Sequence, residues 1–286
     1  MFQTGLRKGE DIFDNVKKMV RIKPQLRYLE FHLTDHCNLN CKGCGHFTPL
    51  AGKTFADLND YIRDLKQLQK LFSTIKTIVL MGGEPLLHPQ IEAFLFETRS
   101  IFPNSSIKIY TNGILLPKMS ESFWNACRAC SIDIDITLYP PVKPKEADLI
   151  RLVEEKGLKV STHSITLFFA FYNNKGDTCA KTAYAKCHKR WYNPMLRNGK
   201  IYVCHKPATL KYFNKKFNLK IPIDGFVNIH DPLLNGWDVI EKLDIAPSAC
   251  RYCTLGLDTI PAFPWAPSNR VLQDWDASEA KFQQKI

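Results

Sequence analysis

The 286-residue chain has no run of about 18 apolar residues, so we expect no transmembrane helix and no membrane partner. The first residues lack the apolar core of a secretory signal. Internal repeats, a phosphate-binding loop and an RNA-binding signature are also missing. These absences indicate a cytoplasmic globular protein. An apolar content of 45% suffices for one large domain, with or without an appendage.

Acidic residues are missing from one long stretch of a chain whose formal net charge is +11. No Asp or Glu occurs between Thr178 and Ile223. The basic residues of this stretch are Lys181, Lys186, Lys189, Arg190, Arg197, Lys200, Lys206, Lys211, Lys215, Lys216 and Lys220. This balance suits an anionic partner, although a solvated basic face explains it equally well.

Cysteine is plentiful, with ten residues in the chain. The C-x-x-C and C-x3-C spacings favour metal binding over disulfides. Cys37, Cys41 and Cys44 follow the spacing C-x3-C-x2-C. Three thiolates in one loop can ligate three irons of a 4Fe–4S cluster and leave the fourth iron open to a small molecule. A zinc knuckle completed by His36 or His46, or three unrelated thiols, is the alternative.

Strand and helix patterns alternate through the middle of the chain, which predicts a parallel sheet with right-handed crossovers. Strands are expected at Leu26–Leu33, Ile75–Met81, Ile107–Thr111, Ser131–Leu138 and Leu158–Ile165, with 166–171 as part of a sixth. Helices are expected at 11–20, 54–72, 89–101, 119–129 and 144–156, with Thr54 as the N-cap of the second. The alternation stops beyond Phe171, where we expect a domain boundary.

The cysteine loop after the first strand, Gly82-Gly83-Glu84-Pro85 after the second and Tyr110–Gly113 after the third together resemble the radical S-adenosylmethionine (SAM) enzymes. The resemblance covers about Leu26 to Ile165. It implies an α/β fold, a partial (β/α)6 barrel open on one side. It also implies a SAM-binding 4Fe–4S cluster on Cys37, Cys41 and Cys44, which cleaves SAM reductively to a 5′-deoxyadenosyl radical.

The same resemblance implies roles for the residues that contact SAM. Gly82 and Gly83 would approach its methionine group, Glu84 would accept from its amino group, and Pro85 would fix the turn. Asn112 could contact SAM or cap the next helix. One departure concerns the adenine. Gly43 stands where the family usually has an aromatic residue, so Phe47 or His46 would have to replace it.

A second cysteine set resembles the twitch appendage of these enzymes, a truncated SPASM domain with one auxiliary 4Fe–4S cluster. Cys187 and Gly199 are separated by eleven residues, Gly199 and Cys204 by four, and Cys250 and Cys253 form C-x2-C. The turn 197–200 predicts a hairpin that returns the chain toward Cys187. Four thiolates leave no open iron, which favours electron transfer. A structural zinc site is the alternative.

These observations predict four parts: a helical lead-in over 1–25, the barrel over 26–171, a cysteine-rich α+β twitch domain over 172–260, and an unassigned tail over 261–286. We expect a monomeric enzyme that oxidises an anionic small molecule, such as a sugar, cyclitol or nucleotide-like alcohol. The second cluster would accept the electron, and a flavodoxin or ferredoxin-type protein would supply reducing power. Modification of a ribosomally made peptide is the alternative reaction. A non-catalytic zinc protein that binds nucleic acid is the alternative of another class. It would explain the charge and the cysteines but not Gly82 to Pro85 or the alternation of strands and helices.

The remaining candidates have modest expected roles. Cys127 and Cys130 are expected to be small core residues. Cys179 is a spare ligand, a thiol near the substrate or a buried cysteine. His88 is expected to serve structure. His205 and Lys206 follow Cys204 and have either a surface role or a functional one beside the second site.

Overall fold

The computed structural model describes residues 22–187, 193–254 and 260–277. The helix expected at 11–20 lies outside these residues, as do Lys189 and Arg190. No helix in the described ranges is both long and apolar enough to cross a bilayer.

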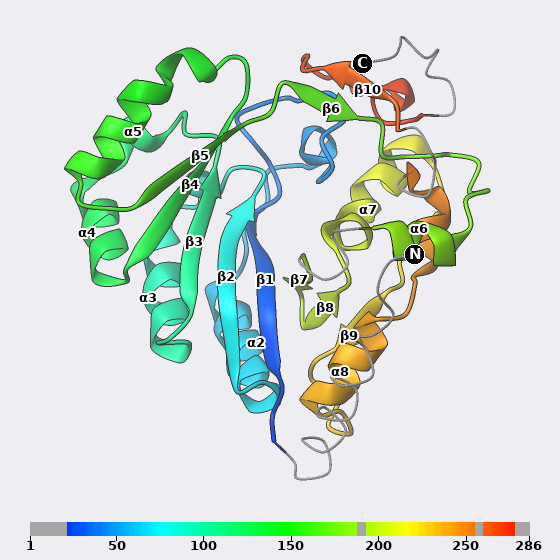
Figure 1. Cartoon of the computed structure of the whole chain (residues 1–286), viewed down its shortest axis with the longest axis horizontal. Helices are drawn as coiled ribbons and strands as arrows, with labels where there is room; N and C mark the ends of the chain where they lie inside the picture. The colour runs from blue at the N-terminus through cyan, green and yellow to red at the C-terminus, as the bar shows by residue number, and fades with distance from the viewer. Residues whose placement is uncertain (1–21, 188–192, 255–259, 278–286) are drawn as a thin grey trace, which may run out of the picture.

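A mainly parallel sheet forms the centre of the molecule (Figure 1). Its strand order is β5-β4-β3-β2-β1-β7-β8-β9. Neighbours from β5 through β7 run parallel, and the pairings of β7 with β8 and of β8 with β9 are antiparallel. The strands are β1 (Gln25–Thr34), β2 (Thr74–Gly82), β3 (Ser106–Thr111), β4 (Ile132–Leu138), β5 (Val160–Ser164), β7 (Met195–Arg197), β8 (Lys200–Tyr202) and β9 (Phe226–Asn228). The α/β class and the partial barrel are therefore confirmed.

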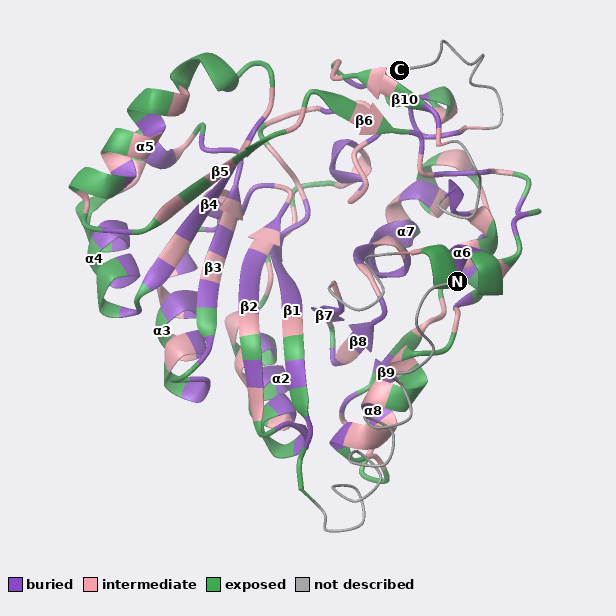
Figure 2. Ribbon diagram, in the orientation of Figure 1, coloured by how far each residue is buried: buried purple, intermediate pink, exposed green. Residues whose placement is uncertain are grey.

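The first four helices of the barrel pack on the outer face of this sheet, where Figure 2 shows their inner sides buried. They are α2 (Leu58–Leu71), α3 (Ile91–Ile101), α4 (Glu121–Ala129) and α5 (Glu146–Glu155). The apolar stripe predicted for α2 is confirmed, since Tyr61, Leu65 and Leu68 are buried in the main core. The predicted N-cap is wrong. Asp57, not Thr54, accepts a hydrogen bond from the backbone N–H of Asp60 at 2.9 Å.

The prediction that 166–171 contributes a sixth strand to the barrel is wrong. A strand does form at β6 (Leu167–Phe169), but it pairs antiparallel with β10 (Ala262–Pro264) instead of joining β5. The chain leaves the sheet after Ile165, whose N–H donates to the Leu138 carbonyl at 3.1 Å. The far side of β1 is occupied by β7. An apolar run predicts a strand but does not say which partner satisfies its backbone groups.

The cysteine-rich part continues the central sheet rather than standing apart from it. Its helices are α6 (Ala180–Lys186), α7 (His205–Phe217) and α8 (Gly236–Leu243). The predicted hairpin turn is confirmed between β7 and β8, where Asn198 (φ 48°) and Gly199 (φ 70°) are left-handed. Short 3-10 segments complete the fold: η1 (Thr48–Leu50), η2 (Pro85–Leu87), η3 (Leu116–Lys118), η4 (Lys143–Lys145), η5 (Ser248–Tyr252) and η7 (Leu272–Asp274).

Candidate metal centres

The first three cysteines lie together in the loop that follows β1, at the carboxyl end of the parallel sheet. Burial, with a smaller contribution from the nearby Cys44 thiol, raises the pKa of Cys41 to about 12, although a hydrogen bond from Trp265 opposes the rise. Burial likewise raises the pKa of Cys37 far above its ordinary value, with added repulsion from Glu84, Cys44 and Cys41. These thiols are close enough together for the charge of one to raise the pKa of another. They would become thiolates only beside a compensating cation such as a metal cluster.

The glycine pair after β2 makes room for this loop. A Cβ on Gly82 would lie 2.1 Å from the Thr34 carbonyl oxygen, and a Cβ on Gly83 would lie 2.1 Å from the His36 carbonyl oxygen. The Gly83 N–H donates to the Thr34 carbonyl at 2.9 Å. The two turns are thus in direct backbone contact, which only glycine permits. A role of the pair toward the methionine group of SAM stays a prediction.

Glu84 is fully buried and ties the ends of β2 and β3 together. Its carboxylate accepts hydrogen bonds from the Thr111 hydroxyl (2.6 Å), the Asn112 N–H (2.9 Å) and the Leu86 N–H (3.2 Å). Burial raises the pKa of Glu84 to about 7, although the three hydrogen bonds oppose the rise. Pro85 begins η2 directly afterwards and is buried, as expected of a residue that fixes the turn.

Asn112 reaches the cysteine loop from the end of β3. Its side-chain N–H2 donates to Asn38 Oδ1 at 2.6 Å and contacts Cys37 Sγ at 3.6 Å. Its Oδ1 accepts from the Ile114 N–H at 3.0 Å, which closes the turn. Asn112 therefore combines a turn-closing contact with a position beside the first cysteine.

The expected replacements for the missing aromatic residue at Gly43 are both engaged elsewhere. Phe47 is fully buried, with its ring enclosed by Tyr172, Phe213 and Trp275. His46 hydrogen-bonds to His32 at 2.9 Å and stacks on His205, with ring centroids 4.2 Å apart. A Cβ on Gly43 (φ +68°) would lie 2.5 Å from Phe263 Cζ, so the ring of a distant residue occupies that side of the loop.

The C-terminal tail, which the sequence left unassigned, packs along the cysteine loop. The Trp265 indole N–H donates to Cys41 Sγ at 3.1 Å, and the Trp275 indole N–H donates to the Cys44 carbonyl at 2.9 Å. Backbone hydrogen bonds join Lys42 to Ala266 (2.8 Å) and Ser268 to Asn40 (2.7 Å). The tryptophans are the feature of the sequence that could have indicated this packing, because a buried indole N–H needs a hydrogen-bond acceptor.

The second cysteine group is assembled from three separate segments: the end of α6, the start of α7 and η5. Burial raises the pKa of Cys204 to about 12; Lys206 opposes this rise, and the nearby Cys253 and Cys187 thiols contribute to it. Burial also raises the pKa of Cys250 well above its ordinary value, with repulsion from Cys204, Cys253 and Cys187. The four cysteines predicted as one set therefore lie near one another.

The other cysteines are placed mostly as expected. Cys127 and Cys130 are buried in the main core, which confirms their structural role. Cys179 is exposed at the start of α6, so the buried alternative is wrong. His88 is buried, hydrogen-bonds to the Ala56 carbonyl at 3.1 Å and packs its ring on Phe94, in keeping with a structural role.

Neither group of thiols is drawn together around a single position. Among the described residues, no three His, Cys, Asp or Glu side chains are gathered tightly enough to hold one metal ion. A tetrahedral zinc with Zn–S bonds of about 2.3 Å needs sulfurs about 3.8 Å apart. Cluster ligands bind different irons, so their sulfurs need not come this close together. The thiols within each group nevertheless interact electrostatically.

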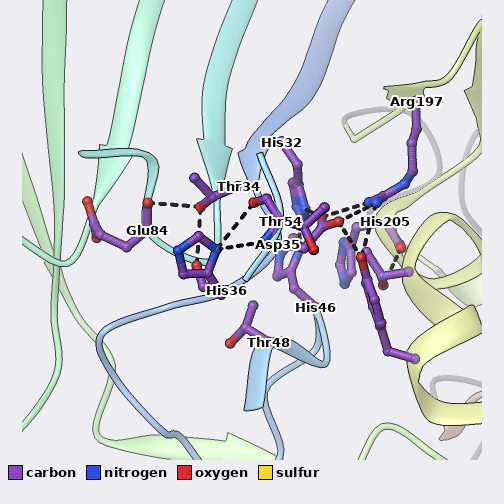
Figure 3. Close-up of polar contacts among 12 residues, drawn as sticks. His32, Thr34, Asp35, His36, His46, Thr48, Thr54, Glu84, Arg197 and His205 are labelled. Atoms are coloured by element: carbon purple, nitrogen blue, oxygen red, sulfur yellow. Dashed lines mark hydrogen bonds and ion pairs between the residues drawn. The ribbon is translucent and has the colours of Figure 1, made fainter. Parts of the chain in front are cut away.

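A polar network centred on Asp35 links the end of β1 with the hairpin and with the start of α7, as Figure 3 shows for His32, His46, Arg197 and His205. Arg197, from the hairpin turn, donates to both carboxylate oxygens of Asp35, with 2.8 Å for the Nη1 contact. The Tyr212 hydroxyl on α7 donates to the same carboxylate, and His32 lies 3.1 Å from it. Burial alone would raise the pKa of Asp35, but hydrogen bonds from Arg197 and His32 hold it well below its ordinary range. The His46–His205 stack extends the network to the residue after Cys204.

The geometry defines a class of protein. Its members have a partial parallel barrel whose first strand leads into a loop with three cysteines. Residues 31–171 match the Radical SAM superfamily. The match covers the barrel, just under half of the chain, and it assigns the barrel to that superfamily.

Curated relatives match only part of the chain. The GTP 3',8-cyclase of Microcystis aeruginosa is 30% identical over 124 residues, covering 39% of this chain and 35% of that protein. The GTP 3',8-cyclase of Petrotoga mobilis is 34% identical over 96 residues, covering 32% and 28%. The chain thus spans about a third of the length of the relatives it matches.

Two solved structures share the fold over most of the chain. BtrN in complex with AdoMet and 2-DOIA matches with a TM-score of 0.51 at 16% identity, covering 81% of this chain and 94% of that chain. The enzyme anSMEcpe with bound AdoMet matches with a TM-score of 0.52 at 11% identity, covering 82% and 84%. At these identities the likeness concerns the fold alone. It extends beyond the barrel into the cysteine-rich part.

The buried ion pair yields a stability prediction. Asp35→Asn leaves Arg197 charged, buried and half-paired, so the free energy of unfolding in urea should fall by about 3–5 kcal/mol. Asp148→Asn is the matched control. Asp148 also pairs with an arginine, Arg151, but its side chain is 72% exposed, so the change should stay within about 0.5 kcal/mol. Equal effects of the two variants would contradict the assigned role of the network.

The glycine contact yields a second prediction. Gly83→Ala places a methyl group against the His36 carbonyl and should displace the cysteine loop. Iron in the reconstituted full chain should fall from about eight to about four per chain, because only the first site is disturbed. Gly52→Ala is the control, since a Cβ there meets nothing within 4 Å. Full iron content in the Gly83 variant would show that the contact is dispensable.

The burial of Glu84 predicts a pH dependence. Its pKa rises from 4.5 to about 7 on folding, so its contribution to stability is fully present below pH 4.5 and is lost as the pH rises to about 7. Between these limits the wild type should lose up to roughly 3 kcal/mol more stability than Glu84→Gln. Urea unfolding without SAM at several pH values measures this difference. Parallel pH profiles for the two proteins would refute it.

Proposed function

We propose that the chain is a radical SAM enzyme whose Cys37, Cys41 and Cys44 hold a SAM-binding 4Fe–4S cluster. When bound and reduced, this cluster supplies the electron that cleaves SAM to a 5′-deoxyadenosyl radical. The observation that carries the proposal is the gathering of these thiols against Gly83, Glu84 and Asn112 at the carboxyl end of the sheet. The Radical SAM match covers the same residues.

We assign Cys187, Cys204, Cys250 and Cys253 to a second cluster that accepts an electron. Four thiolates occupy every iron, which suits electron transfer. The proposed reaction is therefore a two-electron oxidation of a small alcohol, such as a sugar, cyclitol or nucleotide-like compound. The fold likeness to BtrN, which is bound to AdoMet and 2-DOIA, covers 94% of that chain and supports this choice. The alternative of a non-catalytic zinc protein does not explain Gly82 to Pro85 or the barrel.

The basic stretch has a proposed use in binding an anionic partner. Arg197 and Lys206 are engaged internally, with Asp35 and Cys253. The lysines that remain exposed on α6, α7 and just beyond are Lys181, Lys186, Lys211, Lys215, Lys216 and Lys220. Because these lysines lie on the surface, we favour a role in docking an acidic flavodoxin or ferredoxin-type electron donor over a role in binding the substrate.

The central test removes the first cluster. Replacing Cys37, Cys41 and Cys44 together with Ala should leave one cluster per chain and abolish 5′-deoxyadenosine production from SAM under dithionite. Cys179→Ala, which removes an exposed cysteine outside both groups, should keep both clusters and the activity. If the triple variant still formed 5′-deoxyadenosine, the radical-generating site would have to lie elsewhere.

A further inference from the structure

The two cysteine groups differ in the kind of side chain that donates to their sulfurs. At the first group the donors are neutral: the Trp265 indole N–H reaches Cys41 Sγ at 3.1 Å, and the Leu39 backbone N–H reaches Cys37 Sγ at 3.3 Å. At the second group the donor is an ammonium, since Lys206 Nζ lies 3.0 Å from Cys253 Sγ.

Several contacts hold this ammonium in place. Lys206 Nζ also donates to the Phe171 carbonyl at 3.1 Å and lies 4.6 Å from the centroid of the Phe171 ring. The side chain is half-buried in the first turn of α7, two residues after Cys204. Its position is therefore fixed from both sides, by the segment that follows β6 and by the cysteine itself.

The charge of Lys206 acts on more than one ligand. The Lys206 ammonium also lies close enough to Cys204 and Cys250 to interact electrostatically with both. With its direct contact to Cys253, Lys206 influences three of the four thiols. The N-terminal end of α7 begins at Cys204 and adds a partial positive charge on the same side.

Reduction adds one negative charge to an iron–sulfur cluster, so hydrogen bonds to its sulfurs favour the reduced form. A charged donor is roughly twice as strong as a neutral one. The contact of the Lys206 ammonium with Cys253 would therefore favour the reduced form of a cluster at the second site.

We propose that Lys206 raises the reduction potential of the second cluster and so favours transfer of the substrate electron to it. The proposal rests on the proposed function. The substrate alcohol carbon loses a hydrogen atom to the 5′-deoxyadenosyl radical. A cluster held by Cys187, Cys204, Cys250 and Cys253 would take up the one electron that the resulting carbon radical gives up, while the hydroxyl proton would go to water and a carbonyl group would remain.

The test measures potential instead of turnover. In the full chain with Cys37, Cys41 and Cys44 changed to Ala, EPR-monitored titration reports the second cluster alone. Lys206→Gln should lower its equilibrium constant for reduction about tenfold, which for one electron is about 59 mV. Lys206→Arg keeps the charge and should stay within about threefold of the parent. Lys211→Gln, an exposed lysine on the same helix, should leave the potential unchanged.

A potential for Lys206→Gln within about threefold of the parent would overturn the proposal. Lys206→Met, which keeps the stem over Phe171 without the charge, repeats the measurement if the Gln variant fails to assemble. Loss of iron from both neutral variants, with iron retained by Lys206→Arg, would assign Lys206 to cluster assembly and also contradict the proposal. A parent protein that holds zinc and shows no redox signal would instead refute the proposed function.

Discussion

The buried contact of Asp35 with Arg197 is the constraint on which the arrangement of the two cysteine groups depends. Asp35 follows the first strand and opens the cysteine loop, whereas Arg197 and Tyr212 belong to the hairpin and helix on either side of Cys204. A charged carboxylate that is almost fully buried tolerates little movement, because every displaced partner would leave it desolvated and unpaired. The β1–β7 pairing acts in the same sense through the backbone. The two sites are therefore held in one relative position by the folded core rather than by a linker.

Segments far apart in the chain complete each site. The first loop is covered by the tail, through Phe263 against Gly43 and through Trp265 on Cys41. The second group takes Lys206 from α7 and is bordered by Tyr172, whose pKa burial raises, with nearby thiols adding to the rise. In both places an aromatic or cationic side chain lies beside a buried sulfur. This pattern gives the protein a local means of adjusting the electronic environment of each site.

The sequence was a good guide wherever a local pattern decides the structure. Alternation and helical periodicity located β1 to β5 and α2 to α5, and the left-handed pair at Asn198 and Gly199 made the predicted turn. It failed where distant partners decide. The pairing of β6 with β10, the close approach of Gly83 to His36 and the indole contact with Cys41 all depend on residues that no local pattern connects. The cap of α2 failed for a smaller reason, since Thr54 and Asp57 are both acceptable caps and the helix begins at the later one.

The proposed function requires two chemically different clusters in one chain, of which only the first would have an open iron. The direct measurement is EPR spectroscopy of the reconstituted, dithionite-reduced full chain with and without SAM. The account predicts two four-iron signals, with SAM changing the signal of one and leaving the other as it was. A chain that binds stoichiometric zinc in place of iron, or two clusters that both ignore SAM, would contradict it.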